Sequence, residues 1–582
     1  MDLEALVRRA EAWLSHDPDP TDRAELDALV RERSPELAER FAGPLAFGTA
    51  GLRGILGAGE TRMNLAVVRR ASYGLARYLL ATMPDAATRG VVVGYDGRRK
   101  SREFAEATAS VLAAAGLAVH LSEKLCPTPV VAFAVRDFQA AAGVMVTASH
   151  NPPEYNGYKV YADNGAQIVP PWDTGIAARI DCCPPADEIA TMAFAEACER
   201  GLVTTFGDAL DRRYLDAVLA LVEPEGPGRS LKLVYTPMHG VGWPLACKVL
   251  REAGFSALEV VPEQAEPDGN FPTVAFPNPE EPGALDLALA LARKTGGDLI
   301  LANDPDADRL AAVVRLGDGS YRQLTGNEVG VLLGHTALER DLGTKRSPMP
   351  LVVTTVVSSP QLLAIAKELG ADSATTLTGF KWIANLAMAR EASNTSRFVF
   401  GYEEALGYSV GTVVRDKDGI SAALALATLA AELHTDGKTL TDELERIARK
   451  FGLFVSHQRS IQFPGAEGKE QMASLMAGLR AAPPTRLARF EVEALTDCAR
   501  GTKADRSGRT TPIELPKSDV LVFELDGGHR VIARPSGTEP KLKIYYDVRE
   551  PLAAHETVGD ATLRAKDTIA ELDRAIVILL GL

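Results

Sequence analysis

Apolar residues along most of the chain follow two patterns, short continuous runs and longer stretches with helical spacing. Residues 91–96 form a continuous, β-branched run, residues 101–115 have helical spacing, and residues 117–121 form another apolar run. A strand, a helix and a second strand in succession favour parallel pairing of the two strands. The pattern therefore predicts a parallel sheet covered by helices.

The same succession of strands and helices occurs twice more. The second copy has strands at 231–235, 258–261 and 298–302 with helices at 244–252 and 284–294. The third has strands at 351–357 and 397–400 with helices at 328–338, 361–369 and 420–433. We therefore expect three successive α/β units.

Both ends of the chain depart from this pattern. The first ~40 residues have amphipathic helical spacing, as expected of a surface helix. After residue 450 the pattern predicts strands at 455–461 and 490–495, a hairpin turning at 526–528 and a final helix at 562–579, in which Asp-Gly is the hairpin signal. We expect four domains, at residues 1–205, 206–322, 323–450 and 451–582.

Composition narrows the class of protein. The chain has 582 residues, 46% of them hydrophobic and 24% charged, which is the balance of an ordinary globular protein. A net charge of −14 argues against nucleic acid as a partner, because phosphate backbones select basic surfaces. No apolar run is long enough for a membrane span, and the first ten residues lack a secretion signal. We expect a cytoplasmic monomer or weak homo-oligomer.

Residues 147–159 contain a candidate nucleophile. Ser149 follows the apolar run 143–146 directly, has His150 beside it and Lys159 ten residues on. The segment has no nearby acid for a hydrolase-type triad and no G-x-S-x-G elbow. Either Ser149 is a covalent catalyst of another kind, or the segment is an ordinary polar turn.

A second segment has the residues of a cation site. Asp304, Asp306 and Asp308 alternate directly after the predicted buried strand that ends at residue 302, where α/β proteins place ligands. Three clustered carboxylates repel one another unless a hard cation neutralises them, and oxygen ligands without His or Cys suit Mg²⁺. The alternative is a solvated acidic turn. Together with Ser149, the segment points to phosphoryl chemistry, in which the hydroxyl carries phosphate.

Three further segments offer groups for a phosphorylated sugar. Residues 534–543 combine a guanidinium, hydroxyls, a glycine and ammonium groups, which are donors for a phosphate dianion, unless they form a polar surface turn. The loops at 378–381 and 401–408 both contain glycine, and the paired carboxylates of the second loop, Glu403 and Glu404, would accept sugar hydroxyls unless they are buried or helix-capping glutamates. Lys417 would act as a general acid or base if its surroundings lower its pKa, although most such lysines are solvated.

The serine, aspartate, Glu403-Glu404 and 534–540 loops occur in the order of the α-D-phosphohexomutase family, and the chain resembles that family over nearly its whole length. Residues 47–54 and 267–273 resemble its type 2 phosphoglucomutase/phosphopentomutase branch. The resemblance implies three consecutive mixed-sheet α/β domains plus a smaller C-terminal α+β domain around a central cleft. The domains would in turn carry phosphoserine, bind metal, recognise sugar and bind phosphate.

The resemblance also implies roles for individual residues. The catalytic residues would be Ser149, His150, Lys159, Arg53 and Lys417, and the Mg²⁺ ligands would be Ser149, Asp304, Asp306 and Asp308. The substrate-binding residues would be Thr49, Arg309, Thr378, Gly379, Glu403, Ala405, Arg534, Ser536, Gly537, Thr538 and Lys543. Ala405 stands where glucose mutases of the family often have Ser, and Lys543 stands where Arg is common.

The implied activity is interconversion of a sugar 1-phosphate and 6-phosphate, with glucose as the favoured sugar, through phosphoserine and a bisphosphate intermediate. Glucose 1,6-bisphosphate would be the activator. The alternatives are a phosphopentomutase, a phosphomannomutase, a hexose 1,6-bisphosphate synthase with an acyl-phosphate donor, and a non-catalytic sugar-phosphate sensor.

Overall fold

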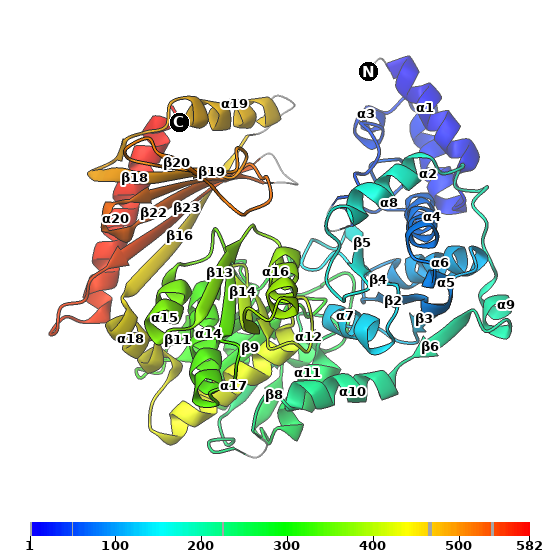
Figure 1. Ribbon diagram of the computed structural model, residues 1–582. Coiled ribbons are helices and arrows are strands. Elements are labelled where there is room, and N and C mark those ends of the chain that lie inside the picture. Colours follow the sequence, from blue (N-terminus) through cyan, green and yellow to red (C-terminus); the bar gives the residue numbers. More distant parts are fainter. Residues whose placement is uncertain (1–2, 49–50, 224–225, 464–467, 537–540, 582) are drawn as a thin grey trace. The chain divides into compact units, whose positions relative to one another are not determined.

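The computed structural model describes residues 3–48, 51–223, 226–463, 468–536 and 541–581 (Figure 1). It contains two compact units, and each is built from two separate stretches of the chain. The first unit comprises Met1–Leu324 and Leu406–Asp436, and the second comprises Thr325–Ala405 and Gly437–Leu582. Each unit has hydrophobic cores of its own.

The first ~40 residues are largely helical, as the amphipathic pattern predicted, but they form three helices rather than one. They are α1 (Leu3–His16), α2 (Pro20–Arg31) and α3 (Glu36–Arg40). Asp19 caps α2 by accepting a hydrogen bond from the backbone N–H of Thr21 at 2.8 Å, and Pro20 occupies the first turn, where its missing N–H costs nothing. The helices enclose a small core that includes Leu26 and Phe41.

The first sheet has the strand order β1-β5-β4-β2-β3-β6. Its parallel part, β2 (Val91–Tyr95), β3 (Val119–Ser122), β4 (Ala142–Val146) and β6 (Val203–Phe206), includes the two predicted apolar runs at 91–96 and 117–121. Its helices are α4 (Leu65–Thr82), α5 (Ala86–Arg89), α6 (Ser101–Ala114), α7 (Thr128–Asp137), α8 (Trp172–Asp181) and α9 (Phe194–Glu199).

Two antiparallel strands that the pattern analysis missed extend this sheet. β5 (Tyr155–Ala162) pairs with β4, and β1 (Leu52–Ile55) pairs with β5 at the sheet edge. β5 is buried along almost its whole length, so its polar residues do not alternate with apolar ones and the usual strand signal is absent. The serine loop is the connection between β4 and β5.

The second sheet has the order β11-β10-β9-β7-β8. β7 (Leu233–Thr236), β8 (Leu258–Val260) and β9 (Leu299–Asn303) are parallel, whereas β10 (Leu310–Arg315) and β11 (Tyr321–Gln323) continue antiparallel from β9 and were not predicted. The helices are α10 (Asp208–Leu219), α11 (Trp243–Glu252), α12 (Pro262–Ala265) and α13 (Asp286–Thr295).

A helix from much later in the chain completes the first unit. α17 (Gly419–Thr435) packs against β9, β10 and α11, and β15 (Gly407–Val410) precedes it. Asp418 caps α17 by accepting hydrogen bonds from the backbone N–H groups of Ile420 and Ser421. Because α17 is apolar nearly all round, it is buried from Gly419 to Ala431.

The second unit begins with parallel strands in the order β13-β12-β14. These are β12 (Pro350–Thr355), β13 (Asp372–Thr376) and β14 (Arg397–Glu403). The helices are α14 (Gly326–Gly343), α15 (Gln361–Leu369), α16 (Phe380–Ala392) and α18 (Leu440–Phe451). The segment 401–408, expected as a loop, consists of the end of β14, a short turn and the start of β15.

The C-terminal part of the second unit is an antiparallel sheet in the order β16-β23-β22-β21-β18-β19-β20, with β17 on β18. α19 (Gly468–Ala481) and α20 (Val558–Leu579) share one core with it (Figure 1). The predicted hairpin at 526–528 joins β21 to β22 through a short 3₁₀ turn, η1 (Asp526–Gly528). The strands are β16 (Leu453–Gln462), β17 (Arg486–Leu487), β18 (Phe490–Asp497), β19 (Thr502–Asp505), β20 (Thr510–Pro512), β21 (Leu521–Leu525), β22 (Arg530–Pro535) and β23 (Lys541–Glu550). The α/β fold class is thus confirmed.

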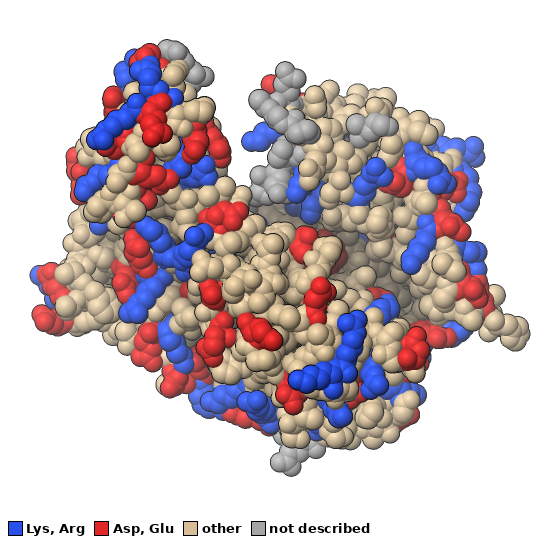
Figure 2. All heavy atoms as spheres, turned by 180° about the vertical axis from the view of Figure 1, so that it is seen from behind, with Lys and Arg blue, Asp and Glu red and all other residues tan. Residues whose placement is uncertain are grey.

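The surface carries both signs of charge. On the face in Figure 2, acidic and basic side chains are mixed rather than gathered by sign. The ion pairs of the described residues include Arg212 with Glu252, at 2.7 Å, and Arg213 with Asp137, at 2.7 Å. Of the helices the structure describes, none has the length and hydropathy that crossing a membrane requires.

Candidate active site

Ser149 lies just beyond the carboxyl end of β4, on the turn between β4 and β5. Its φ of 53° is in the left-handed region, which costs free energy for any residue with a side chain. The Thr147 hydroxyl accepts a hydrogen bond from the Ser149 backbone N–H at 2.8 Å. The serine is therefore held in a strained turn by its own loop, with 3% of its surface exposed.

Arg98 holds the rest of the serine loop and was not predicted. Its guanidinium donates hydrogen bonds to four backbone carbonyls of the loop: Ser149 at 2.6 Å, Pro152 at 2.9 Å, Tyr155 at 3.1 Å, and Asn151. Arg98 follows β2, the parallel neighbour of β4, so both segments leave the sheet at the same edge. That adjacency is a signal by which the residue could have been found.

The three predicted aspartates form a buried cluster after β9. Asp304, Asp306 and Asp308 are at most 1% exposed, and one carboxylate oxygen of each lies within 4.8 Å of the others. The Ser149 hydroxyl donates to Asp304 Oδ2 at 2.8 Å, which joins the serine loop to the cluster. Thr128, at the start of α7, donates to Asp306 Oδ2 at 2.6 Å, and no sequence pattern indicated it.

Two lysines contact the cluster from different elements. Lys159 of β5 donates to Asp306 Oδ2 at 2.7 Å and to Asp308 Oδ2 at 2.9 Å. Lys417 lies just before α17, and its Nζ is 3.2 Å from Asp308 Oδ2. The structure thus brings together residues that are more than 250 positions apart in the sequence.

The electrostatics of the cluster suit a hard cation. Burial and repulsion from Asp306 and Asp308 raise the pKa of Asp304 well above its usual range. Burial also raises the pKa of Asp308, but Lys159 and Lys417 outweigh it and hold that pKa below its usual range. Among the described residues, Oδ1 of Asp306 and Oδ1 of Asp308 are buried without a hydrogen-bond partner. Oxygen donors with spare capacity and repelling charges fit Mg²⁺.

His150, Arg53 and Arg309 surround the serine. His150 Nδ1 is 3.1 Å from the Ser149 hydroxyl, and burial together with Arg309 and Arg53 lowers the pKa of His150 well below 6.5, which favours the neutral ring. Arg53 is exposed and donates to the Asn151 side chain at 3.1 Å. The Arg309 backbone N–H donates to Asp304 Oδ1 at 2.9 Å. The structure therefore places all three beside the serine loop or the aspartate cluster.

Gly48 and Gly51, just ahead of β1, exchange two backbone hydrogen bonds of 2.9 Å. Gly51 has a φ of 92°, and a Cβ there would lie 1.8 Å from the Tyr158 carbonyl oxygen, so position 51 requires glycine. Of the predicted site residues, Thr49, Gly537 and Thr538 lie outside the described residues.

In the second unit, the predicted sugar-binding residues approach one another. The Gly379 backbone N–H donates to Glu403 Oε1 at 2.7 Å, and Gly379 has a φ of 118°. The buried Thr378 hydroxyl has no hydrogen-bond partner among the residues described. Ala405 follows Glu404, whose carboxylate accepts a hydrogen bond from Ser358 at 3.0 Å and is thereby held in the fold.

The predicted phosphate-binding residues lie on two neighbouring strands of the same unit. Arg534 of β22 and Lys543 of β23 are directly opposed in the antiparallel register. The Ser536 backbone N–H donates to the Lys541 carbonyl at 2.7 Å and so continues the pairing beyond β22. Cross-strand neighbours lie about 5 Å apart, so the two cations can act on one anion.

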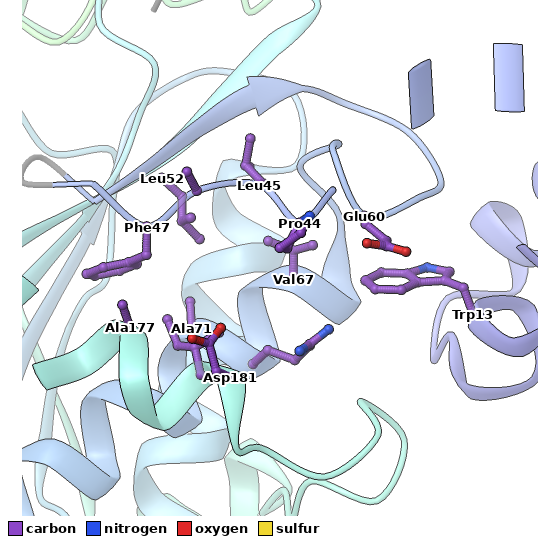
Figure 3. A pocket seen from close by; sticks show the side chains of 13 residues that line it. Trp13, Pro44, Leu45, Phe47, Leu52, Glu60, Val67, Ala71, Ala177 and Asp181 are labelled. Carbon is purple, nitrogen blue, oxygen red and sulfur yellow. The ribbon is translucent and has the colours of Figure 1, made fainter. Parts of the chain in front are cut away.

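A separate apolar pocket lies among α1, α4, α8 and the start of β1 (Figure 3). Its volume is about 170 Å³, and its wall includes Trp13 of α1, Phe47 and Leu52, the first residue of β1. None of the predicted site residues that the structure describes lines it. The pocket is therefore distinct from the serine and aspartate site.

Comparison with known proteins agrees with this arrangement. Three family models match in order: phosphoglucomutase/phosphomannomutase α/β/α domain I at residues 44–182, domain II at 212–317 and domain III at 325–451. Domain I contains Ser149 and Lys159, domain II the aspartate cluster, and domain III Glu403 and Lys417. The fold and the buried serine next to three aspartates define a sugar phosphomutase.

Several relatives match over most of their length. A probable phosphomannomutase of Haemophilus influenzae is 42% identical over 491 residues, 84% of this chain and 93% of that protein. A probable phosphoribomutase of Schizosaccharomyces pombe is 38% identical over 567 residues, 94% of each. A phosphoglucomutase of Staphylococcus epidermidis is 36% identical over 520 residues, 89% of this chain and 93% of that protein. The chain belongs to the α-D-phosphohexomutase family, whose members are intramolecular phosphotransferases, and it is an enzyme of that class.

Proposed function

We propose that the chain interconverts glucose 1-phosphate and glucose 6-phosphate, with Ser149 as a reusable phosphate carrier and glucose 1,6-bisphosphate as intermediate and activator. The observation that supports this most directly is the 2.8 Å hydrogen bond between the Ser149 hydroxyl and Asp304 in the buried cluster. Ser149 has neutral His150 beside it, but its hydroxyl also donates to a carboxylate of a candidate metal site, which a hydrolase triad does not contain.

The transfer exchanges one phosphorus–oxygen bond for another. The bond between phosphorus and Ser149 Oγ breaks, and a new bond forms from phosphorus to the C6 oxygen of glucose 1-phosphate. Lys417, which first loses one proton to solvent and becomes a neutral amine, takes the C6 hydroxyl proton as general base and returns to the ammonium form. Ser149 Oγ regains a proton from neutral His150, 3.1 Å away, whose other ring nitrogen takes one up from solvent. The bisphosphate then reverses, and its C1 phosphoryl group returns to Ser149, leaving glucose 6-phosphate.

The charged residues around Ser149 prepare the site for this transfer. Asp304, Asp306, Asp308 and the phosphoserine would hold Mg²⁺, which when bound offsets charge on the transferring phosphoryl group. Arg53, Lys159 and Arg309 supply positive charge from the protein itself. Because the cluster is at most 1% exposed, bulk water is kept away from the phosphoserine that it would hydrolyse.

Substrate contacts are assigned by the family resemblance. Glu403, Thr378, Gly379 and Ala405 would bind the sugar, and the 2.7 Å bond from Gly379 to Glu403 orients that carboxylate. Arg534, Ser536, Gly537, Thr538 and Lys543 would bind the non-reacting phosphate, and Thr49 the reacting one. Arg534 and Lys543 support this by facing each other across β22 and β23.

A pentose phosphate is the second candidate substrate. The match to the probable phosphoribomutase extends over 94% of both chains, and Ala405 removes a hydroxyl that glucose mutases of the family often have. We further propose that the protein is cytoplasmic, a monomer or weak homo-oligomer, and divided at about residues 205, 322 and 450.

A comparison of sugars tests the proposal. Turnover of the 1-phosphates of glucose, mannose, ribose and deoxyribose is measured with and without glucose 1,6-bisphosphate. We expect the highest kcat/KM on glucose 1-phosphate and stimulation by the bisphosphate. A higher value on ribose or deoxyribose 1-phosphate makes the enzyme a phosphopentomutase. Net bisphosphate synthesis from an acyl phosphate, without isomerisation, would establish the synthase alternative.

A further inference from the structure

The carboxylate of Asp416 connects Lys417 to strand β5. Its Oδ2 accepts hydrogen bonds from the Tyr161 hydroxyl at 3.0 Å and from Gln167 Nε2 at 2.8 Å. Its Oδ1 accepts the backbone N–H of Lys417 at 2.8 Å and lies 3.7 Å from the Lys417 ammonium. Both oxygens are therefore engaged, one toward β5 and its following turn, the other toward Lys417.

One face of strand β5 bears on the positions of two lysines, Lys159 and Lys417. Lys159 and Tyr161 are two residues apart, so their side chains lie on the same side of the strand. Lys159 reaches Asp306 and Asp308 directly, whereas Tyr161 reaches Asp308 only through Asp416 and Lys417. A single strand face thus sets where both ammonium groups stand relative to the aspartate cluster.

The backbone on either side of Lys417 is fixed by buried tyrosines. Asp416 and Asp418 are each 1% exposed, and Tyr161 and Tyr214 are completely buried. The Tyr214 hydroxyl donates to Asp418 Oδ1 at 2.8 Å, as Tyr161 does to Asp416. A buried carboxylate is costly unless its hydrogen bonds are made, so these partners restrict the segment strongly.

We propose that Asp416, held by Tyr161 and Gln167, is a positioning residue that keeps the Lys417 ammonium against Asp308 for phosphoryl transfer. The proposal rests on the proposed function, in which Lys417 handles the proton of the sugar hydroxyl. Asp416 and Tyr161 act through Lys417 and have no direct contact with the reacting groups. Their loss would leave the lysine present but displaced.

A matched pair of tyrosine substitutions tests this. Tyr161→Phe removes the hydroxyl that binds Asp416. Tyr158→Phe removes a hydroxyl from the same strand, equally buried, that instead contacts Ser72 at 3.1 Å. Relative to Tyr158→Phe, we expect Tyr161→Phe to lower kcat about tenfold, with KM changed less than about twofold. Equal kcat values for the two variants would overturn the proposal.

A double-mutant cycle distinguishes positioning from general weakening of the fold. In a Lys417→Met background, adding Tyr161→Phe should cost no further activity, because the group it positions is already absent. A second loss of about tenfold in that background would show that Tyr161 acts by another route.

Crystal structures of the two phenylalanine variants give a readout that needs no substrate. We expect Lys417 Nζ to shift by about 1 Å or more from Asp308 in Tyr161→Phe and to stay in place in Tyr158→Phe. An unmoved Lys417 contradicts the positioning role. If the wild-type protein turned over none of the four sugar phosphates, the proposed function would be contradicted. The crystal structures would still show whether Tyr161 and Asp416 position Lys417.

Discussion

The serine loop depends on a few side chains that hold its backbone. Ser149 has a positive φ, and Arg98 alone contacts four carbonyls of the loop. A phosphoryl carrier must stand in line with the oxygen it exchanges with, and a displacement of about 1 Å costs about 100-fold in rate. The strained turn and the Arg98 guanidinium that binds its carbonyls therefore act together to orient Ser149.

Replacing Arg98 tests whether its hydrogen bonds orient the serine loop. Arg98→Lys keeps the charge but cannot span four carbonyls, so we expect kcat to fall about 100-fold and the midpoint of thermal unfolding to drop by several degrees. Arg99→Lys is the control, because Arg99 is exposed there and donates one bond, to Pro153 at 2.9 Å. Equal rates for the two variants would show that the loop is held without Arg98.

Replacing the nucleophile tests the carrier role. Ser149→Ala should abolish both turnover and the incorporation of phosphate from labelled glucose 1,6-bisphosphate, because the acceptor oxygen is gone. Binding of glucose 6-phosphate, measured by calorimetry, should remain. Labelling of the alanine variant to the wild-type level would place the phosphate on another residue.

The aspartate cluster predicts a metal requirement. Chelation with EDTA should reduce turnover by at least about 100-fold and added Mg²⁺ should restore it. Asp306→Asn should raise the Mg²⁺ concentration for half-maximal activity and lower the maximal rate. Asp318→Asn, on an exposed turn where Asp318 accepts from Ser320 at 2.6 Å, is the matched control. Full activity in EDTA would exclude the metal assignment.

At the scale of elements, one buried acid of α2 predicts a pH effect. Burial and repulsion from Asp19 and Asp17 outweigh the attraction of Lys100, and together they raise the pKa of Asp22 from 3.8 to about 7. At a pH between these two pKa values, Asp22 keeps its proton in the folded chain and loses it in the unfolded chain. The contribution of Asp22 to the free energy of unfolding therefore falls as the pH rises from about 4 to 7.

Asp22→Asn removes that dependence. The unfolding midpoint of Asp22→Asn minus that of the wild type should increase from pH 5 to pH 8, by the equivalent of about 1 to 3 kcal/mol. Asp27→Asn, on the half-exposed face of the same helix and paired with Arg31, should show no such increase. A difference that is independent of pH would mean that Asp22 is ionised throughout.

The sequence allowed most parallel strands and about half of the helices to be predicted from local patterns, such as residues 361–369, which form α15 as expected. Helices such as α4, α10, α16 and α18 were not predicted. β5 was missed because burial on both faces removes the alternation of apolar and polar residues. The cluster of aspartates was predicted from their alternate spacing and from their position directly after a predicted buried strand. The contact of Asp416 with Tyr161 was not, because it joins residues 255 positions apart that share no local pattern.

At the scale of the whole molecule, the first unit is built from two separate stretches of chain. A protein ending at Leu324 lacks α17, which covers β9, β10 and α11. We expect such a fragment to bind a hydrophobic dye and to unfold without a cooperative transition, because the apolar face that α17 buries would meet water. A cooperative calorimetric transition in the fragment would show that α17 is dispensable.

The return of the chain to the first unit also bears on synthesis at the ribosome. Asp304, Asp306 and Asp308 emerge early, but Lys417 and α17 follow only after the 81 residues from Thr325 to Ala405, which belong to the other unit. Domains commonly fold in order as they emerge. Because Lys417 and α17 belong to the first unit, we expect this unit to remain incomplete until residue 436 has left the exit tunnel.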